Sequence, residues 1–321
     1  MRVVVTGAAG FIGSHICERL LDRGEQVLGI DALTDFYPAE LKRRNCAALL
    51  ARPGFDLLVR DLNEAGLAGV LAGADAVCHL AGAPGVRSSD GRTFETGNVG
   101  ATRAVMRAAA EAAVPRVVLA SSSSVYAPAQ SPLREDAPLS PVSPYGRSKL
   151  RAERLAARLA AREGTELVVL RLFTVYGPRQ RPDMAFARFI AAARGDDAMP
   201  VYGDGGQRRD FTYVGDAADA ILLGLDRGRH GRIYNVSGAC STALAEAFEL
   251  LAASLGQAPP LAFAPTDRRE HRCTAADLTL AVRELGYAPR VSLEEGIAAQ
   301  VAGTNGHGPA AAGVAVRASV E

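Results

Sequence analysis

Cysteines and long apolar runs are scarce in this chain of 321 residues, and each scarcity excludes a class of protein. The five cysteines stand far apart, with no Cys-x-x-Cys pair and no Cys/His cluster at metal-ligand spacing. Their spacing excludes a disulfide-stapled scaffold, predicts no metal site and fits a reducing cytoplasm. No apolar stretch reaches the roughly 18 residues of a membrane span, and the N-terminus lacks the apolar segment of a signal peptide. We therefore expect a cytoplasmic protein that has no membrane partner.

The sequence also lacks an excess of one charge. Lysine and arginine number 36 against 35 aspartate and glutamate residues, so the net charge of +1 creates no field that would hold nucleic acid. With 48% hydrophobic and 22% charged residues, the composition is that of an ordinary globular protein. Only two of the basic residues are lysines, Lys42 and Lys149. A lysine retained among so many arginines hints that its particular chemistry is needed.

Short apolar runs alternate with helical periodicity in the first half of the chain. The pattern predicts helices over residues 10–22 and from Pro144 to about Arg162. The predicted strands are Arg2–Thr6, Gln26–Ile30, Phe55–Val59, Ala76–His79, Val117–Ala120 and Glu166–Leu170. Strands separated by helices imply parallel βαβ units with right-handed crossovers. The expected fold is therefore α/β, a Rossmann-type doubly wound parallel sheet.

The pattern loosens beyond Pro178, where prolines and glycines punctuate shorter segments. We predict a smaller C-terminal substrate-binding domain there, set on the carboxyl edge of the sheet where ligands bind in such folds. The predicted division is a Rossmann domain over residues 1–175 and a mainly substrate-binding domain over residues 176–301. Residues 302–321 are rich in alanine and glycine and read as a disordered tail.

A glycine-rich turn, Thr6–Gly13, follows the first predicted strand and opens the first helix. Gly7 permits a tight turn, Gly10 lets a pyrophosphate approach the N–H groups at the helix N-terminus, and Gly13 lets helix and strand pack closely. Asp31 ends the second predicted strand, where its carboxylate can bond the ribose hydroxyls and would repel a 2′-phosphate. The pattern thus predicts a bound dinucleotide, NAD rather than NADP.

Further cofactor contacts are expected in this turn and after the third and fourth strands. The predicted residues are Phe11, Ile12, Asp61, Leu62, Leu80, Ala81 and Gly82. Asp61 either receives the adenine or is a solvated loop residue. His79, at the end of the fourth strand, is expected to be packed or hydrogen-bonded rather than catalytic.

A serine cluster, Ser121–Tyr126, follows an apolar strand, and Tyr145 and Lys149 come some twenty residues later. On a helix, Tyr145 and Lys149 lie one turn apart on the same face, so the ammonium sits near the phenol and stabilises a phenolate. We predict Tyr145 as the catalytic base and Lys149 as its partner, a role that arginine cannot fill as a reversible proton relay. The alternative is a surface pair opening an amphipathic helix, and the accompanying serines and glycine turn argue against it.

Together these segments resemble the extended short-chain dehydrogenases/reductases of the NAD-dependent nucleotide-sugar epimerase/dehydratase family. Three further segments fit in order, so that the likeness extends to about residue 300: Leu170–Pro178, Arg209–Val214 and Ile233–Gly238. The resemblance implies that Ser122 hydrogen-bonds the C4 oxygen of the sugar. Related dehydratases carry an Asp-Glu pair where Ser123 and Ser124 stand, and related decarboxylases carry Glu at the position of Ser124. Both reactions are therefore disfavoured, although the serines remain candidate substrate ligands.

The segment Tyr176–Ala185 resembles the signature of UDP-glucuronate 4-epimerases. This resemblance implies that Thr174 and Arg181 approach the sugar carboxylate, which suits a guanidinium because it forms bidentate, charge-assisted bonds. Arg87 is a second candidate, since its loop also resembles that group.

The family likeness also implies ligands for the UDP diphosphate. Arg209 matches one such ligand, and Arg268 matches a second less well, because the usual Arg-x-Gly-Asp appears here as Arg268–His271. The helices over residues 101–113 and 149–162 correspond to those that form a four-helix interface in relatives, so a homodimer is expected.

The resemblance implies an enzyme that interconverts UDP-glucuronate and UDP-galacturonate at C4. A hydride would pass to tightly bound NAD and return from bound NADH through a transient 4-keto intermediate, so the cofactor is recycled. The first alternative is a UDP-glucose/UDP-galactose 4-epimerase. A UDP-glucuronate decarboxylase, a sugar-nucleotide dehydratase and a non-catalytic NAD-binding sensor also stay open.

Overall fold

The computed structural model describes residues 1–85, 91–128, 132–195, 197–265 and 272–305. Seven strands form its central sheet in the order β11-β6-β5-β4-β1-β2-β3, and all of them are parallel. Their bounds are β1 Arg2–Thr6, β2 Gln26–Asp31, β3 Phe55–Val59, β4 Ala76–His79, β5 Arg116–Ser122, β6 Glu166–Leu172 and β11 Ile233–Val236. The direction of winding reverses between β1 and β4, which is where dinucleotides bind in such sheets. The predicted fold class and all six predicted strands are confirmed.

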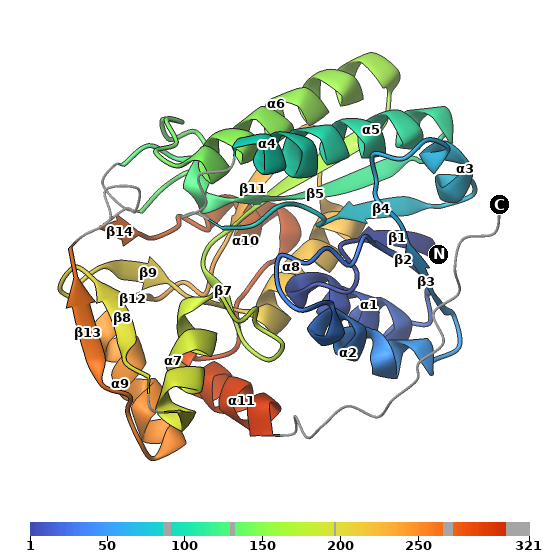
Figure 1. The fold of residues 1–321 in the computed structure, drawn as a ribbon. Helices are drawn as coiled ribbons and strands as arrows, with labels where there is room; N and C mark the ends of the chain where they lie inside the picture. Colours follow the sequence, from blue (N-terminus) through green and yellow to red (C-terminus); the bar gives the residue numbers. More distant parts are fainter. Residues whose placement is uncertain (86–90, 129–131, 196, 266–271, 306–321) are drawn as a thin grey trace.

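Helices cover both faces of this sheet (Figure 1). One face carries α1 (Phe11–Asp22), α2 (Ala39–Leu50), α8 (Val214–Arg227) and α10 (Thr279–Leu285). The other carries α3 (Leu67–Leu71), α5 (Ala101–Glu111) and α6 (Pro144–Glu163). The short α4 (Gly91–Phe94) continues through a π-helical turn, Glu95–Gly100, into α5. Two apolar cores result, one on each side of a sheet whose strands are buried on both faces.

A smaller unit lies beside the carboxyl ends of the strands (Figure 1). It contains α7 (Ala185–Arg194), α9 (Leu244–Leu255) and α11 (Leu293–Asn305). Its short strands pair as β7 (Val175–Tyr176) with β10 (Thr212–Tyr213), β8 (Met199–Tyr202) with β13 (Leu261–Ala264), and β9 (Arg208–Asp210) with β12 (Ser241–Ala243) and β14 (Cys273–Thr274). A separate aromatic core that includes Tyr176, Phe186, Phe189, Phe211 and Phe248 holds it together.

Two sequence-based boundaries differ from the structure. The predicted division at residue 175 does not separate the part around the central sheet from the smaller unit. The reason is that α8 and β11, which come after residue 175, belong to the part around the central sheet. The predicted tail at 302–321 starts too early, since α11 continues through Asn305. Its buried Ile297 and Val301 anchor the helix, and Gly303 lies close to Pro178. Composition concealed this last turn, whereas residues 306–321 lie outside the described part of the chain.

Within the described residues, no helix combines the length and the apolar character needed to cross a lipid bilayer.

A buried ion pair joins β6 to the helix α6. Arg171 is 1% exposed and bonds both carboxylate oxygens of Glu153 through its Nε and Nη2 atoms, at 3.1 and 2.9 Å. The Glu153 carboxylate also accepts a hydrogen bond from Ser121 at the end of β5, and the Arg171 guanidinium lies 4.8 Å from the ring centre of Tyr126. These contacts fix the register of β5, β6 and α6 relative to one another. They lie at the end of the sheet where the serine cluster follows β5.

Removing one partner of this pair should strongly destabilise the protein. We expect Glu153→Ala to lower the free energy of unfolding by about 3–5 kcal/mol, because it leaves the Arg171 charge buried without compensation. The double variant Glu153→Met/Arg171→Met should recover most of that loss, since apolar side chains of similar volume remove both charges. Denaturant unfolding followed by circular dichroism measures both values. A single variant within 1 kcal/mol of wild type, on the scale of an exposed pair, would contradict the argument.

Candidate active site

Three backbones meet at the glycine turn between β1 and α1. Gly7 has φ 72°, and a Cβ atom there would lie 2.8 Å from the backbone nitrogen of Ala81, which follows β4. A Cβ atom at Gly13 would overlap the carbonyl oxygen of Gly7. Side chains are therefore excluded at both positions, and the ends of β1 and β4 approach the first turn of α1 directly. The structure thus places Gly7, Gly13 and Ala81 together, and their contact with the cofactor stays a prediction.

The N-terminus of α1 is open to an anion. Its N-cap is Gly10, no side-chain hydrogen bond caps this end among the described residues, and its first turn holds no acidic residue. The first N–H groups of a helix have no partner within the helix and carry the positive end of its dipole, so a pyrophosphate fits here. Phe11 is buried and Ile12 packs against the core, which anchors the helix while Gly10 leaves its end uncovered.

Asp31 stands at the end of β2 beside this turn. Its two carboxylate oxygens accept hydrogen bonds from the backbone N–H groups of Ala9 at 3.1 Å and Leu33 at 2.8 Å. Burial raises the pKa of Asp31, while these two bonds and the nearby charge of Lys42 act in the opposite direction. A carboxylate has about four acceptor positions, so two remain for ribose hydroxyls. The residues present therefore fit NAD.

The other predicted cofactor residues follow the ends of β3 and β4. Leu80 and Ala81 donate from their backbone nitrogens to the Thr6 hydroxyl, at 3.2 Å each, which ties the end of β4 to that of β1. Leu62 is buried, whereas Asp61 is exposed and its Oδ1 accepts two hydrogen bonds from Asn63. Contact of Asp61 with the adenine stays a prediction.

His79 has a structural environment. Its imidazole is 1% exposed and bonds the hydroxyls of Thr6 at 2.7 Å and Thr102 at 3.2 Å. Burial, followed by the charge of Lys149, lowers the pKa of His79 to about 3. A neutral imidazole with both nitrogens occupied agrees with the hypothesis of a hydrogen-bonded rather than a catalytic histidine.

Tyr145 and Lys149 lie in the first two turns of α6. Ser143 caps this helix by accepting a hydrogen bond from the N–H of Gly146 at 3.0 Å, and Pro144 suits the first helical position. Lys149 is 9% exposed and donates from Nζ to the carbonyl oxygen of Ala120 at 2.7 Å. Tyr145 is half-buried. The spacing of four residues puts both side chains on one face of the helix, as predicted.

The serine turn lies directly against the start of this helix. A Cβ atom at Gly146 would overlap the carbonyl oxygen of Ser124, so the close approach requires glycine. Ser122 ends β5, and its hydroxyl accepts a hydrogen bond from the N–H of Ser124 at 3.2 Å. Ser122, Ser123 and Ser124 are half-buried. The structure therefore brings the backbone of the serine turn to the helix end that carries Tyr145.

Asn98 is a site residue that the sequence interpretation missed. It is 2% exposed in the π-helical turn and donates to the Ser148 hydroxyl at 2.7 Å and the Ala83 carbonyl at 3.2 Å. Within the described residues its buried Oδ1 has no hydrogen-bond partner. A Cβ atom on Gly82 would lie 2.6 Å from this oxygen and 3.9 Å from Nζ of Lys149. An unmatched buried acceptor costs about 1–3 kcal/mol, so this spot suits a polar ligand group or water.

The predicted substrate residues are less concentrated. Thr174 is half-buried between β6 and β7, and its carbonyl accepts from the N–H of Thr212 at 2.9 Å. Arg209 is half-buried on β9. Arg181 forms two hydrogen bonds with Asp183, from Nε at 2.9 Å and Nη2 at 3.0 Å, and lies 6.0 Å from the ring centre of Phe36. These contacts tie Arg181 to its own loop. The other two candidates, Arg87 and Arg268, lie outside the described residues.

In the part of the chain that the structure describes, no group of three or more His, Cys, Asp or Glu side chains is arranged to hold a metal ion.

A doubly wound sheet with an open glycine turn, an aspartate at the end of β2 and a Tyr/Lys helix defines an enzyme of the short-chain dehydrogenase/reductase type. The model of the NAD dependent epimerase/dehydratase family matches residues 3–237. The chain therefore belongs to this family, and its cofactor is NAD.

Three relatives show the range of activities within this likeness. The chain is 40% identical over 307 residues to the uncharacterized UDP-glucose epimerase YtcB of Bacillus subtilis (strain 168), covering 94% of this chain and 97% of that protein. It is 36% identical over 313 residues to a dTDP-glucose 4,6-dehydratase of Streptomyces griseus, covering 95% and 94% respectively. The crystal structure of UDP-glucuronic acid 4-epimerase from Bacillus cereus with UDP-glucuronic acid and NAD matches with a TM-score of 0.92 and 35% identity, covering 95% of this chain and 99% of that one. The names of these relatives thus include both epimerases and a dehydratase.

The role of Tyr145 can be tested by removing only its hydroxyl. We expect Tyr145→Phe to lower turnover of a UDP-sugar by about 10²–10⁴-fold, because general acid–base catalysis is lost. The variant keeps the aromatic ring, which packs edge-on against Phe94 with 6.0 Å between the ring centres. The melting temperature and the NAD content should therefore not change. Tyr234→Phe is a matched control, because its hydroxyl bonds Glu284 away from the site. Near-normal turnover by Tyr145→Phe would reject the assignment.

Proposed function

We propose that this protein is an NAD-dependent UDP-sugar 4-epimerase that interconverts UDP-glucuronate and UDP-galacturonate. The observation that carries the proposal is the serine turn, Ser122–Ser124, which lies against the start of α6 at Gly146. The turn itself carries hydroxyl groups and no carboxylate. Such a turn can hold a sugar oxygen, but it does not contribute the extra acid and base that elimination of water requires.

The chemistry assigned to this chain is proton transfer and positioning. Ser122 holds the C4 oxygen while Tyr145, on the same face of α6 as Lys149, accepts the proton of the 4-hydroxyl group. Bound NAD supplies the hydride acceptor and donor at C4, so the reaction has no net redox change. After the sugar has turned its opposite face to the site, Tyr145 returns the proton to the C4 oxygen. Inversion at C4 follows because the same residues act on the second face.

The substrate acid is supported by the loop after β7 and by a neighbouring structure. Thr174 precedes this loop and Arg181 lies within it, and a guanidinium is suited to bidentate binding of a carboxylate. The Bacillus cereus enzyme, whose structure contains UDP-glucuronic acid, shares this fold over nearly the whole chain. We assign UDP-glucuronate on these grounds, with Arg209, Arg268 and Arg87 as further proposed ligands of the substrate.

UDP-glucose/UDP-galactose 4-epimerisation is the second candidate. Two observations favour it: the description of the Bacillus subtilis relative as a UDP-glucose epimerase, and the pairing of Arg181 with Asp183. Because the Arg181 guanidinium is already bonded to Asp183, it gains less from a sugar carboxylate. A neutral sugar then binds with a smaller disadvantage relative to the acid.

We also propose a cytoplasmic homodimer that forms through α5 and α6. Its support is the family resemblance and the five free cysteines, three of them buried. The exposed faces of these helices carry Arg103, Arg107, Arg154 and Arg158. A two-fold interface here must place acidic residues such as Glu111 against these charges, because facing arginines repel one another.

Substrate choice can be tested with wild type and Arg181→Ala. The wild-type protein, purified without added nucleotide, should carry NAD and convert UDP-glucuronate to UDP-galacturonate without accumulating NADH.

Arg181→Ala should reduce kcat/KM for UDP-glucuronate by roughly 10–100-fold, as expected for losing a charge-assisted contact, with a much smaller effect on UDP-glucose. Loosening the carboxylate should also release some UDP-4-keto-pentose, because the 4-keto form is a β-keto acid that loses CO₂.

Chromatographic separation of the products and mass spectrometry measure these outcomes. Arg52→Ala is a suitable control, since it breaks a surface ion pair with Asp22 and removes an arginine outside the site. Equal depression of both substrates by Arg181→Ala, without the lighter product, would remove the main support for the acid substrate.

A further inference from the structure

The loop of residues 177–183, which joins β7 to α7 and contains Arg181, has an unusual backbone. Gly177 has φ 135° and Arg179 has φ 66°. A residue with a Cβ atom rarely adopts such a left-handed conformation, and it persists only where the surroundings hold it there. What holds Arg179 therefore also determines the path of the loop.

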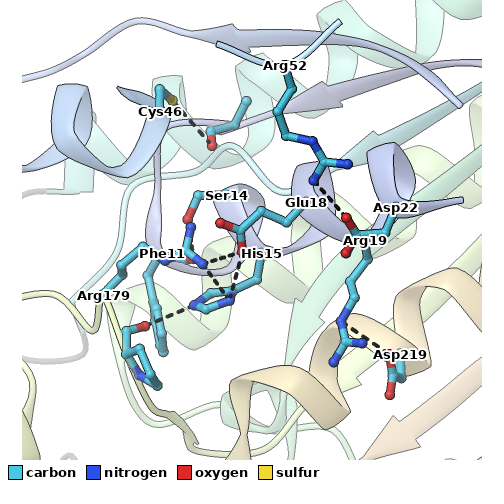
Figure 2. A network of polar contacts seen from close by, with 12 residues as sticks. Phe11, Ser14, His15, Glu18, Arg19, Asp22, Cys46, Arg52, Arg179 and Asp219 are labelled. Carbon is cyan, nitrogen blue, oxygen red and sulfur yellow. Dashed lines mark hydrogen bonds and ion pairs between the residues drawn. The ribbon is translucent and has the colours of Figure 1, made fainter. Parts of the chain in front are cut away.

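The Arg179 side chain reaches across to the dinucleotide-binding helix. Its Nη2 donates to a carboxylate oxygen of Glu18 and to Nδ1 of His15, the latter at 2.9 Å. The other ring nitrogen of His15, Nε2, bonds the carbonyl oxygen of Pro178 at 3.0 Å. Figure 2 shows His15 and Glu18 side by side on α1, with Arg179 approaching them from its own loop. Two successive residues of the loop are thus bonded to one helix.

The protonation of His15 agrees with this arrangement. Burial, followed by the charge of Arg179, lowers the pKa of His15 to about 4, so the imidazole is neutral near pH 7. A neutral imidazole that carries its hydrogen on Nε2 donates to Pro178 and accepts from Arg179 at once. Both ring nitrogens of His15 then have a complementary partner.

The opposite side of the loop is held by α11. The carboxamide of Gln300 is 1% exposed, accepts from the N–H of Gly177 at 2.9 Å and donates to the side-chain oxygen of Gln180 at 2.8 Å. That Gln180 oxygen also accepts from the N–H of Ala187 at the start of α7, at 3.0 Å. Gln300 and Gln180 fix the loop to the smaller unit, whereas the Arg179 side chain and the Pro178 carbonyl link it to α1.

We propose that Arg179 is a positioning residue that latches the loop of residues 177–183 to α1 and thereby sets where Arg181 meets the substrate carboxylate. Arg181 is bonded twice to Asp183 of the same loop, so its guanidinium moves with the loop backbone. The loop backbone is bonded in turn to the helix that holds the pyrophosphate of the cofactor. This inference rests on the proposed function, because it concerns the recognition of the sugar acid.

The test variant is Arg179→Gly in the NAD-loaded protein. Glycine adopts φ 66° without strain, so the substitution removes the contacts with His15 and Glu18 without adding a backbone penalty. We expect peptides that cover residues 177–183 to exchange their amide hydrogens faster. The preference for UDP-glucuronate over UDP-glucose, as a ratio of kcat/KM values, should fall about 10-fold, mainly through a higher KM for the acid. NAD content should stay at the wild-type value.

Three comparisons separate positioning from general stability. Arg52→Ala breaks an ion pair with Asp22, which lies on α1 as Glu18 does (Figure 2), and should change neither exchange nor selectivity. Arg179→Lys keeps the charge, but its side chain is one atom too short to reach the place of Nη2, the nitrogen that bonds both partners, so it should also lose selectivity. In an Arg181→Ala background, Arg179→Gly should cause no further fall in selectivity, because Arg179 acts through Arg181.

The outcomes differ for each failure. Unchanged loop exchange and selectivity in Arg179→Gly would overturn the latch. An equal loss for both substrates, or a further loss of selectivity in the Arg181→Ala background, would show that Arg179 supports the fold and does not act through Arg181. If wild type does not convert UDP-glucuronate, the proposed function fails, and the hydrogen exchange of the loop still decides whether Arg179 holds it.

Discussion

The active site depends on two places where backbone touches backbone. At the first, Gly13 of α1 lies against the carbonyl group of Gly7, and at the second, Gly146 of α6 lies against the carbonyl group of Ser124. Neither contact leaves room for a Cβ atom. The first sets the open helix end beside the strand ends that receive the cofactor. The second delivers Tyr145, the residue before Gly146, to the serine turn. A single methyl group at either glycine would separate elements that the chemistry needs together.

Buried polar contacts then hold α6 along the end of β5. Lys149 donates to the carbonyl group of Ala120, and one helical turn later Glu153 accepts from Ser121. Consecutive residues of the strand are thus bonded to residues of the helix that are four apart, which matches the spacing of the helical turn. Because Glu153 is neutralised by Arg171, the helix carries the ammonium of Lys149 into the site without a second uncompensated charge. Apolar packing alone would not specify this register so closely.

Sequence reasoning recovered what depends on local pattern. The positions of the glycine turn, Asp31, Tyr145 and Lys149 in the fold could be predicted, because each lies at a fixed offset from a strand or helix whose periodicity can be read. Their roles stay predictions. Asn98 was missed because a π-helical turn has no periodic signature, and its role appears only when Gly82 and Lys149 are brought beside it. The contacts of Arg179 with Glu18 and of Gln300 with Gly177 join residues more than a hundred positions apart. Only the folded chain reveals these long-range pairings.

The pairing of Arg181 with Asp183 also changes how acid recognition must be understood. A guanidinium in water exchanges its bonds to water for the charge-assisted bond to a carboxylate, whereas Arg181 already has two bonds to a carboxylate within its loop. The net contribution of Arg181 to binding is the free energy of its bonds to the substrate carboxylate minus that of the bonds to Asp183 that it gives up. Since Arg181 and Asp183 are both partly exposed, their internal ion pair is weak, and giving it up takes away only part of the bond gained with the substrate. Selectivity between an acidic and a neutral sugar therefore depends on where the loop holds the Arg181 guanidinium, because a bidentate bond to a carboxylate requires a particular geometry.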